Sequence, residues 1–405
     1  MNVTKKAFCR VFQKVMHLLI PLFPYREPKI LDSTDEIAEL LRTNNAQSVM
    51  LITDKGIRGL GLTEHLEKHL VEKCIQCHVY DKTVPNPTSE NVEEAFELYR
   101  SCGCQALIAF GGGSSMDCAK AVGARVACPN KPLNKMAGLI KIRKRLPLLI
   151  AIPTTAGTGS EATVASVIVD SETHHKYVIN DFCLIPEYAV LDPKITFGLP
   201  PHLTATTGMD ALTHAVEAYV GRSKTKTTKA ASIEAVKLIF DNLELAYADG
   251  TNIEPRRNML RASYLAGIAF TRSYVGYVHA VAHTLGGKYG VAHGLANAVL
   301  LPHVLRAYGD DVTDSLSELA KAVGLVSKDT PASEAKEAII SHIEGINERM
   351  NIPTKLSCIR LADIPDMAKL ADKEANPIYP VPTLWDAKEL EAIYRLFYDE
   401  SEKSM

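Results

Sequence analysis

Histidine and aspartate residues are spaced along this chain so that they could bind a metal ion. In the segment GMDALTHAVEAYV, Asp210 and His214 are four residues apart, and His279 and His283 have the same spacing in YVHAVAHTLGG. A separation of four residues places two side chains on the same face of a helix. His293 follows after a glycine-containing turn. The two segments therefore predict two helices that each present a pair of potential metal ligands.

The surroundings of these side chains favour a metal ion. Residues 277–304 contain four histidines, and Lys288 is the lone formal charge among otherwise mostly small and apolar residues. Burying unpaired polar side chains is costly, and a divalent cation removes that cost. Imidazoles together with a carboxylate suit Fe(II) or Zn(II) better than Ca²⁺ or Mg²⁺. His202 and His303 are further candidates, so the spacing alone predicts a site without ranking its ligands.

Two glycine-containing loops could bind phosphate groups. The loop in ALIAFGGGSSMDCAK lies between a strand-like and a helical segment, and IAIPTTAGTGSEAT again follows an apolar run. Glycines allow close approach of a ligand to the backbone, and the start of a helix offers free N–H groups to an anion. Neither loop has the GxGxxG or GxxxxGK[ST] pattern, but two such loops together favour a dinucleotide. Asp54 could bind a ribose hydroxyl and repel a 2′-phosphate, or it could simply cap a helix.

The elements that position these loops alternate between strand and helix. Apolar runs at 48–54, 105–110 and 145–153 predict buried strands, and helical patterns follow the first two. This alternation is typical of a parallel sheet covered by helices on both faces. We expect segments 162–170 and 189–193 to form an antiparallel addition to it.

The pattern becomes entirely helical from about Leu199 onward. We therefore predict an α/β dinucleotide-binding domain over residues 1–198 and an all-helical metal-binding and catalytic domain over residues 199–405. The apolar run near the N-terminus is interrupted by Arg10 and Lys14, and no cleavage site follows it. An amphipathic helix that covers the body of the protein is expected there, rather than a signal peptide or a membrane span.

Composition limits the classes of partner. The chain has 405 residues, of which 46% are hydrophobic and 23% charged, and its formal net charge is −2. We expect no nucleic acid and no membrane as a partner. Nine cysteines, an odd number, indicate reduced thiols and a cytoplasmic protein.

The motifs taken together resemble the iron-containing, or group III, alcohol dehydrogenases. They are GGGSSMDCAK, PTTAGTGSE, GMDALTHAVEAYV, HAVAHTLGG and AHGLANAVLLPHV, in that order. The resemblance implies a dehydroquinate synthase-like architecture and reversible hydride transfer between NAD, with NADP as the alternative, and a small primary alcohol or aldehyde. It implies Fe(II), with Zn(II) as the alternative, and a homodimer or larger assembly.

The resemblance also assigns residues to roles. The implied metal ligands are Asp210, His214, His279 and His293, while His283 becomes a catalytic residue that faces the nicotinamide and substrate. His202 and His303 revert to structural roles. The implied cofactor-binding residues are Asp54, Asn86, Gly112, Gly113, Ser114, Ser115, Asp117, Thr154, Thr155, Thr158 and Lys176.

The chain also departs from the family pattern. Thr284 stands where the family often has proline, Arg272 and Tyr274 occupy a stretch that is usually small or contains asparagine, and the N-terminal segment is longer than usual. The alternatives are a glycerol-dehydrogenase-like polyol enzyme and a dehydroquinate-synthase-like lyase, with a metal-dependent hydrolase as a remote third.

Overall fold

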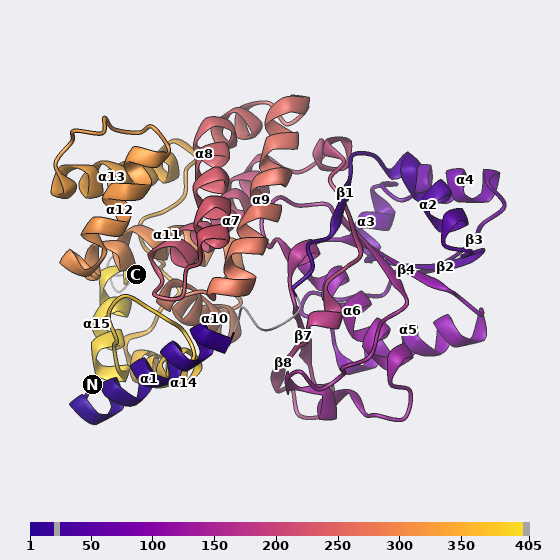
Figure 1. Ribbon diagram of the computed structural model, residues 1–405, viewed down its shortest axis with the longest axis horizontal. Coiled ribbons are helices and arrows are strands. Elements are labelled where there is room, and N and C mark those ends of the chain that lie inside the picture. Colours follow the sequence, from indigo (N-terminus) through magenta and orange to yellow (C-terminus); the bar gives the residue numbers. More distant parts are fainter. Residues whose placement is uncertain (20–24, 400–405) are drawn as a thin grey trace, which may run out of the picture. The chain divides into compact units, whose positions relative to one another are not determined.

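The chain forms two compact units (Figure 1). The computed structural model describes residues 1–19 and 25–399. The α/β unit ends at Leu199, and the helical unit begins at Pro200. The helical unit also contains helix α1 (Val3–Leu19), so the expected first domain, residues 1–198, is wrong at its N-terminal end.

The α/β unit is built on a six-stranded sheet in which every described strand pair is parallel. The strands in spatial order are β1 (Lys29–Leu31), β9 (Tyr188–Val190), β6 (Leu148–Pro153), β4 (Ala106–Gly111), β2 (Ser48–Ile52) and β3 (Gln76–Tyr80). The residues of β2 and β4 are all buried, which explains their continuous apolar runs. The predicted parallel sheet is confirmed.

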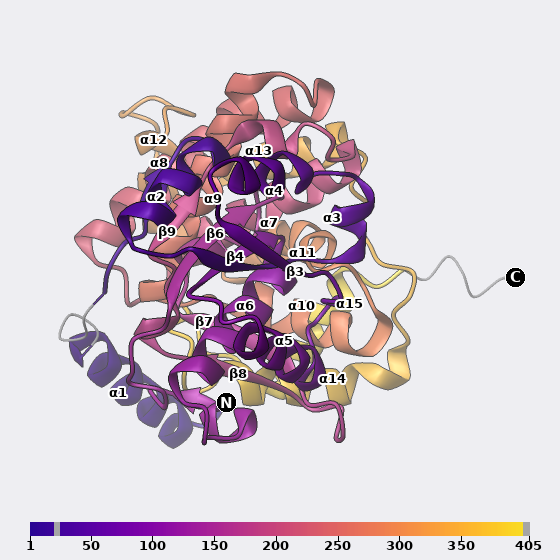
Figure 2. The ribbon, with the colours of Figure 1, turned by 90° about the vertical axis from the view of Figure 1, so that its right-hand side faces the viewer.

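Helices cover both faces of this sheet, as Figure 2 shows. One face packs against α5 (Ser89–Ser101) and α6 (Gly113–Ala127), and the other against α2 (Ile37–Thr43) and α4 (Glu64–Glu72). Successive residues of a strand point to opposite faces, so Met50 joins the first core and Leu51 the second. The short helix α3 (Lys55–Gly59) follows β2 directly.

A small second sheet contains β5 (Gly138–Leu139), β8 (Lys176–Asn180) and β7 (Ala165–Val169). Strand β7 pairs antiparallel with β8. The expected antiparallel addition at 189–193 is wrong, because β9 lies in the main sheet, parallel to both β1 and β6. Ala189 and Val190 are completely buried there, which suits an interior strand of a parallel sheet better than an edge.

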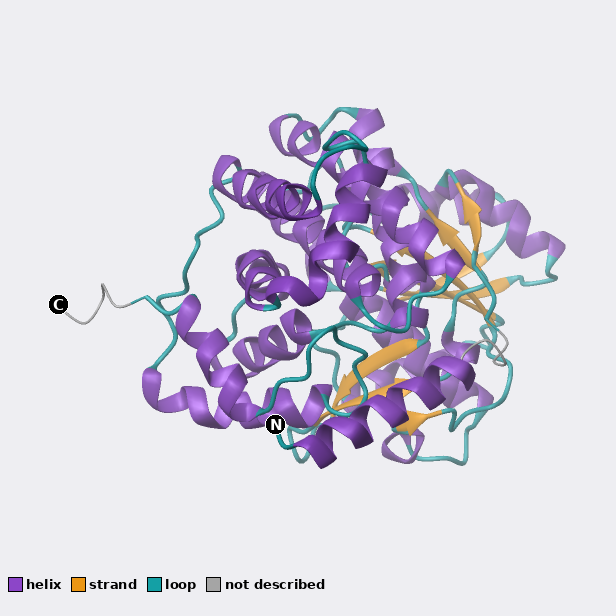
Figure 3. Cartoon of the chain, turned by 60° about the vertical axis from the view of Figure 1, so that its left-hand side comes forward, coloured by secondary structure: helices purple, strands orange, loops and turns teal. Residues whose placement is uncertain are grey.

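The unit that begins at Pro200 is helical, and every strand drawn in Figure 3 belongs to the α/β unit. Its helices are α7 (Pro201–Val220), α8 (Lys226–Ala248), α9 (Ile253–Ser273), α10 (Tyr277–Tyr289), α11 (His293–Ala307), α12 (Thr313–Ala322), α13 (Ala332–Arg349), α14 (Ile364–Ala375) and α15 (Ala387–Leu396). The predicted change from α/β to helical structure is confirmed. Among the described helices, none has the length and apolar character needed to cross a membrane.

Helix α1 packs on the helical unit through its polar side. The Gln13 side chain is buried and donates hydrogen bonds to the carbonyl oxygens of Pro377 and Tyr379, at 3.2 and 2.7 Å. The apolar side chains of Phe8 and Val11 are instead 61% and 63% exposed. The expected amphipathic helix is therefore present, but its apolar face points outward. Residues 20–24, which complete the apolar run, lie outside the described residues.

Candidate functional site

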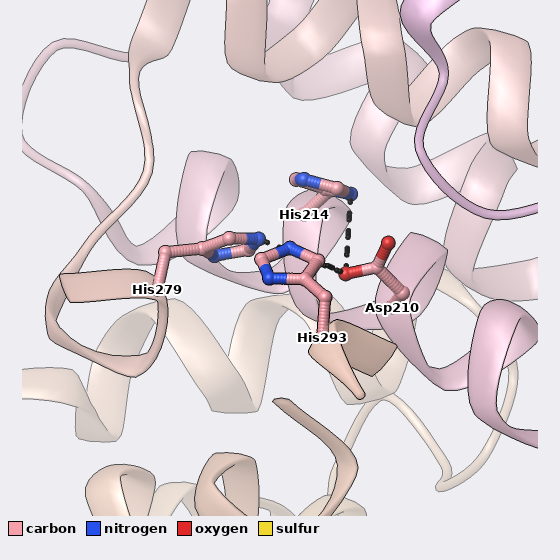
Figure 4. Close-up of side chains that lie close together, drawn as sticks. All are labelled: Asp210, His214, His279 and His293. Atoms are coloured by element: carbon pink, nitrogen blue, oxygen red, sulfur yellow. Dashed lines mark ion pairs between the residues drawn. The ribbon is translucent and has the colours of Figure 1, made fainter. Parts of the chain in front are cut away.

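Four side chains of the helical unit converge on one point (Figure 4). Asp210 and His214 come from α7, His279 from α10, and His293 is the first residue of α11. Each offers one possible ligand atom, and these atoms all lie within 4.8 Å of one another. The structure thus brings together the four residues that the family resemblance assigned to the metal.

The aspartate oxygen lies within 4.0 Å of a ring nitrogen of each histidine. Oδ1 of Asp210 is 3.4 Å from Nε2 of His293, 3.8 Å from Nε2 of His279 and 4.0 Å from Nδ1 of His214. The Asp210, His214 and His279 side chains are buried, whereas that of His293 is 39% exposed. The cluster is therefore enclosed by protein on most sides and open beside His293.

Close packing of two helices brings His293 to Asp210. A Cβ atom added at Gly294 would lie 2.4 Å from the carbonyl oxygen of Thr206, so only glycine allows the first turn of α11 to approach the backbone of α7 this closely. His293 is the neighbour of this glycine. The sequence HG at the start of α11 thus supplies both a ligand and the close approach that positions it.

A buried carboxylate orients His279. Oε2 of Glu217 lies 2.6 Å from Nδ1 of His279, and the backbone N–H groups of Gly276 and Val278 also donate to Glu217 at 2.8 Å. Burial lowers the pKa of His279 well below its usual value, and the neighbouring imidazoles lower it further. The ring is therefore neutral, with its proton on Nδ1 towards Glu217 and the Nε2 lone pair facing Asp210.

The donor set fits a borderline metal ion. Nδ2 of Asn297 lies 2.6 Å from Oδ1 of Asp210, 3.2 Å from Nε2 of His279 and 3.1 Å from Nε2 of His293. The carboxylate oxygen and two ring nitrogens therefore surround a single amide nitrogen. Imidazole nitrogens with one carboxylate oxygen are a ligand set for Fe(II) or Zn(II).

Glu217 and Asn297 also belong to the site, although no sequence motif identified them. Glu217 lies three residues after His214, and Asn297 lies four residues after His293. Each is one helical turn from a proposed ligand and shares its face. That spacing is the signal that could have identified both.

His283 and the two competing histidines lie outside the four-residue cluster. Nδ1 of His283 is 2.7 Å from Oε1 of Glu374 on α14, and its ring stacks on that of His293 with centroids 5.3 Å apart. His303 is bonded to the carbonyl oxygen of Thr354 at 3.0 Å, and His202 is exposed at the start of α7.

In the α/β unit, the two glycine-containing loops lie side by side. The first follows β4, with Gly112 capping α6, and the second follows the neighbouring strand β6. The backbone N–H of Thr154 donates to the carbonyl of Gly111 at 3.1 Å. A Cβ atom on Gly113 would lie 3.2 Å from Cγ2 of Thr158, and one on Gly112 would lie 3.7 Å from Oγ1 of Thr155. The loops therefore share one surface at the carboxyl ends of adjacent parallel strands, where nucleotides bind in such sheets.

Other residues assigned to the cofactor border these loops. The Ser115 hydroxyl is buried behind Gly111 and has no hydrogen-bond partner among the described residues. Lys176 donates to the side-chain oxygen of Asn86 at 2.9 Å, and the backbone N–H of Asn86 donates to Oγ of Ser114 at 3.3 Å. Burial raises the pKa of Asp117, which lies 3.5 Å from Oγ of Ser160, to about 6.

Asp54 follows the end of β2 and caps helix α3. Its Oδ1 accepts a hydrogen bond from the backbone N–H of Ile57 at 2.9 Å. Its other oxygen lies 3.9 Å from the position that a Cβ on Gly111 would take. One oxygen thus has the structural role that the sequence left open, while the second faces the glycine loop.

Family models match both units. The model for iron-containing alcohol dehydrogenase matches residues 31–193, and the model for the C-terminal part of the Fe-containing alcohol dehydrogenase family matches residues 204–398. The chain is 37% identical over 386 residues to 1,3-propanediol dehydrogenase of Citrobacter freundii, covering 94% of this chain and 98% of that protein. It is 37% identical over 320 residues to NAD-dependent methanol dehydrogenase of Bacillus methanolicus, covering 79% and 84%.

A solved structure is similar over nearly the whole chain. The crystal structure of a 1,3-propanediol oxidoreductase has a TM-score of 0.88 and 35% identity, covering 92% of this chain and 99% of that one. The two family models span the loops of the α/β unit and the histidine cluster of the helical unit alike. The chain therefore belongs to the iron-containing alcohol dehydrogenase family, with the dehydroquinate synthase-like fold, and is a metal-dependent, NAD(P)-linked alcohol dehydrogenase and aldehyde reductase.

Proposed function

We propose that Asp210, His214, His279 and His293 hold the metal ion and that the reaction interconverts a small primary alcohol and its aldehyde with NAD(H). The single observation that carries this proposal is the convergence of the four ligand atoms within 4.8 Å. We propose Fe(II) as the native ion and Zn(II) as the alternative. The bound ion would act as a Lewis acid on the substrate oxygen.

The proposed cofactor site is formed by the loops after β4 and β6. Its free backbone N–H groups at the start of α6 and the hydroxyls of Ser115, Thr155 and Thr158 suit a pyrophosphate. The remaining proposed contacts are those of Asp54, Asn86, Gly112, Gly113, Ser114, Asp117, Thr154 and Lys176. Bound NAD(H) supplies the hydride chemistry, while these residues hold and orient it.

His283 is proposed to hold and move the proton of the substrate hydroxyl. Glu374 accepts the Nδ1 proton of the ring, which leaves Nε2 as the atom that exchanges protons. His283→Ala should keep the metal ion but lower kcat by roughly a hundredfold. If the variant kept both the metal content and the kcat of the wild type, His283 would not be the group that moves the substrate proton.

The substrate proposal rests on the chemistry of the relatives, whose names specify 1,3-propanediol and methanol. Its test is a screen of C2 to C6 alcohols, diols and their aldehydes with NAD(H) and NADP(H), on protein loaded separately with Fe(II) and Zn(II). Steady NADH production from a primary alcohol supports the proposal. Turnover of a phosphorylated substrate without net NADH would support a lyase, and hydrolysis without nucleotide would support a hydrolase.

We also propose a homodimer or larger assembly in the cytoplasm. The odd number of cysteines indicates reduced thiols and so supports a cytoplasmic location. The outward apolar side chains of α1 support self-association, because exposed apolar patches commonly mark interfaces. Light scattering of the wild type and of Phe8→Ser/Val11→Ser tests the assembly. A monomeric wild type would contradict it.

A further inference from the structure

Lys120, on the inner side of α6, is completely buried and surrounded by oxygen atoms. Five oxygens lie within hydrogen-bond distance of its Nζ, and none belongs to an acidic side chain. They are the carbonyl oxygens of Ser160 (2.7 Å), Thr163 (3.1 Å) and Ala165 (2.9 Å), and the hydroxyls of Ser160 (3.1 Å) and Thr163 (2.8 Å). Because an ammonium has three protons, its donors are all used and partly shared.

All five oxygens come from the short segment 160–165, which follows the second glycine-containing loop directly. Lys120 itself is on the helix that begins immediately after the first loop. A single side chain therefore ties the continuation of one loop to the helix of the other. Ser166, the residue after this segment, adds a further bond to α6, from its hydroxyl to the carbonyl oxygen of Asp117 at 2.7 Å.

The charge of this lysine is balanced within the α/β unit. The nearby carboxylates of Asp117 and Glu161 attract the ammonium, which opposes the lowering of its pKa by burial. That pKa is about 8, so Lys120 is mostly protonated at neutral pH. Oε1 of Glu161 is buried and has no hydrogen-bond partner among the described residues, and burial raises the pKa of this carboxyl to about 7.

The two glycine-containing loops approach each other closely, so a small movement of either one changes the surface that they share. Gly113 and Thr158 are in near contact, as are Gly112 and Thr155. A shift of the second loop by about an ångström would change the distance between the helix N–H groups and the threonine hydroxyls, which a pyrophosphate must meet together. Without a fixed partner for segment 160–165, the loop would have to become ordered when the cofactor binds, and that ordering weakens affinity.

We propose that Lys120 is a positioning residue for the cofactor, because it fixes the loop after β6 against the start of α6 and so forms the pyrophosphate-binding surface before NAD arrives. Being buried, it does not touch the cofactor. The inference rests on the proposed role of the two loops in cofactor binding.

The experiment measures the dissociation constant of NADH by fluorescence titration on the iron-loaded protein, together with kcat and KM. Lys120→Met should raise the dissociation constant of NADH by about tenfold or more, because the hydrogen bonds to a charged group are lost. The value of kcat at saturating cofactor should stay within about threefold, since the chemistry itself is not touched. Lys131→Met is the matched control, because the Lys131 side chain donates to the carbonyl oxygen of Lys141 at 2.7 Å on an exposed surface of the same unit.

Two further variants keep the inference testable if Lys120→Met does not fold. Thr163→Val removes one hydroxyl acceptor and should weaken NADH binding by a few fold. Lys120→Ala should regain affinity when n-propylammonium is added and should not respond to tetramethylammonium, which has no N–H donor.

Gly113→Ala separates this inference from the proposed function. It inserts a methyl group 3.2 Å from Thr158 and tests the loops directly. If Gly113→Ala weakens NADH binding while folded Lys120 and Thr163 variants bind normally, the positioning role is overturned. If none of the variants alters NADH affinity, the loops are not the cofactor site and the proposed function fails at that point. Loss of kcat without any change in NADH affinity would also overturn the positioning role.

Discussion

Glu217 and His279 form a buried carboxylate–imidazole pair, with Oε2 of Glu217 lying 2.6 Å from Nδ1 of His279. The pair fixes the tautomer and the orientation of an imidazole that we propose as a metal ligand. Glu217 is itself held by two backbone N–H groups at the start of α10. The helix that carries His279 and the carboxylate that orients it are thus positioned by the same contacts.

Loss of this carboxylate should weaken metal binding without removing a ligand. Glu217→Gln should lower the affinity for Fe(II) or Zn(II) by about 10- to 100-fold, since partners of ligating histidines have effects of that size. Metal content after dialysis against a chelator series measures it. The matched control is Glu244→Gln, because Glu244 pairs with Arg349 on the surface. Equal metal retention in both variants would contradict the orienting role.

Removal of a proposed ligand should have a larger effect. His279→Ala should abolish metal retention and turnover while NADH still binds, because the cofactor loops belong to the other unit. Elemental analysis and NADH titration measure the two properties separately. His303→Ala is the control, since that histidine bonds to a backbone carbonyl outside the cluster. Normal activity of metal-free His279→Ala protein would refute the ligand assignment.

The close approach of α11 to α7 should be sensitive to a single methyl group. Gly294→Ala would place a carbon 2.4 Å from the carbonyl oxygen of Thr206, so the helices must separate. We expect a loss of roughly 1–3 kcal/mol in the free energy of unfolding, as for overpacking, and weaker metal retention because His293 moves with α11. Urea unfolding and metal analysis test both parts. Gly287→Ala is the control on α10, since a Cβ there has open space.

Asp54 should contribute to the choice between NAD and NADP. Asp54→Ser keeps a hydroxyl that can cap α3 and removes the negative charge that would repel a 2′-phosphate. The ratio of kcat/KM for NAD to that for NADP should therefore fall, while thermal stability changes little. An unchanged ratio would show that this carboxylate does not select the cofactor.

The buried carboxyl of Glu161 should make stability depend on pH. Burial raises its pKa from 4.5 to about 7, so the folded state binds its proton more tightly than the unfolded state does. This contribution to stability is fully present below pH 4.5 and is lost as the pH rises to about 7. The free energy of unfolding of Glu161→Gln, measured in urea at several pH values, should fall less over this window than that of the wild type. Parallel curves for the two proteins would contradict the prediction.

Much of the architecture could be predicted from local patterns. Buried strands of a parallel sheet have continuous apolar runs, and β2, β4 and β6 have them, while Asp210 and His214 reveal a common helix face through their spacing. The pattern failed for the segment at 189–193, because an apolar run does not specify the direction or the partners of its strand. For α1 the pattern predicted the helix but not which of its faces packs inward, since amphipathicity leaves that choice open.

The sequence by itself determined the kinds of ligand atoms, the two glycine-containing loops and the order of α/β and helical regions, because these depend on residue type and on spacing within single elements. Only the tertiary structure decided that α7, α10 and α11 bring their side chains to one point, that Asn297 faces it while Glu217 orients His279, and that Lys120 joins the two loops. Such relationships join residues tens of positions apart. They arise from the packing of whole helices and strands, which no local spacing encodes.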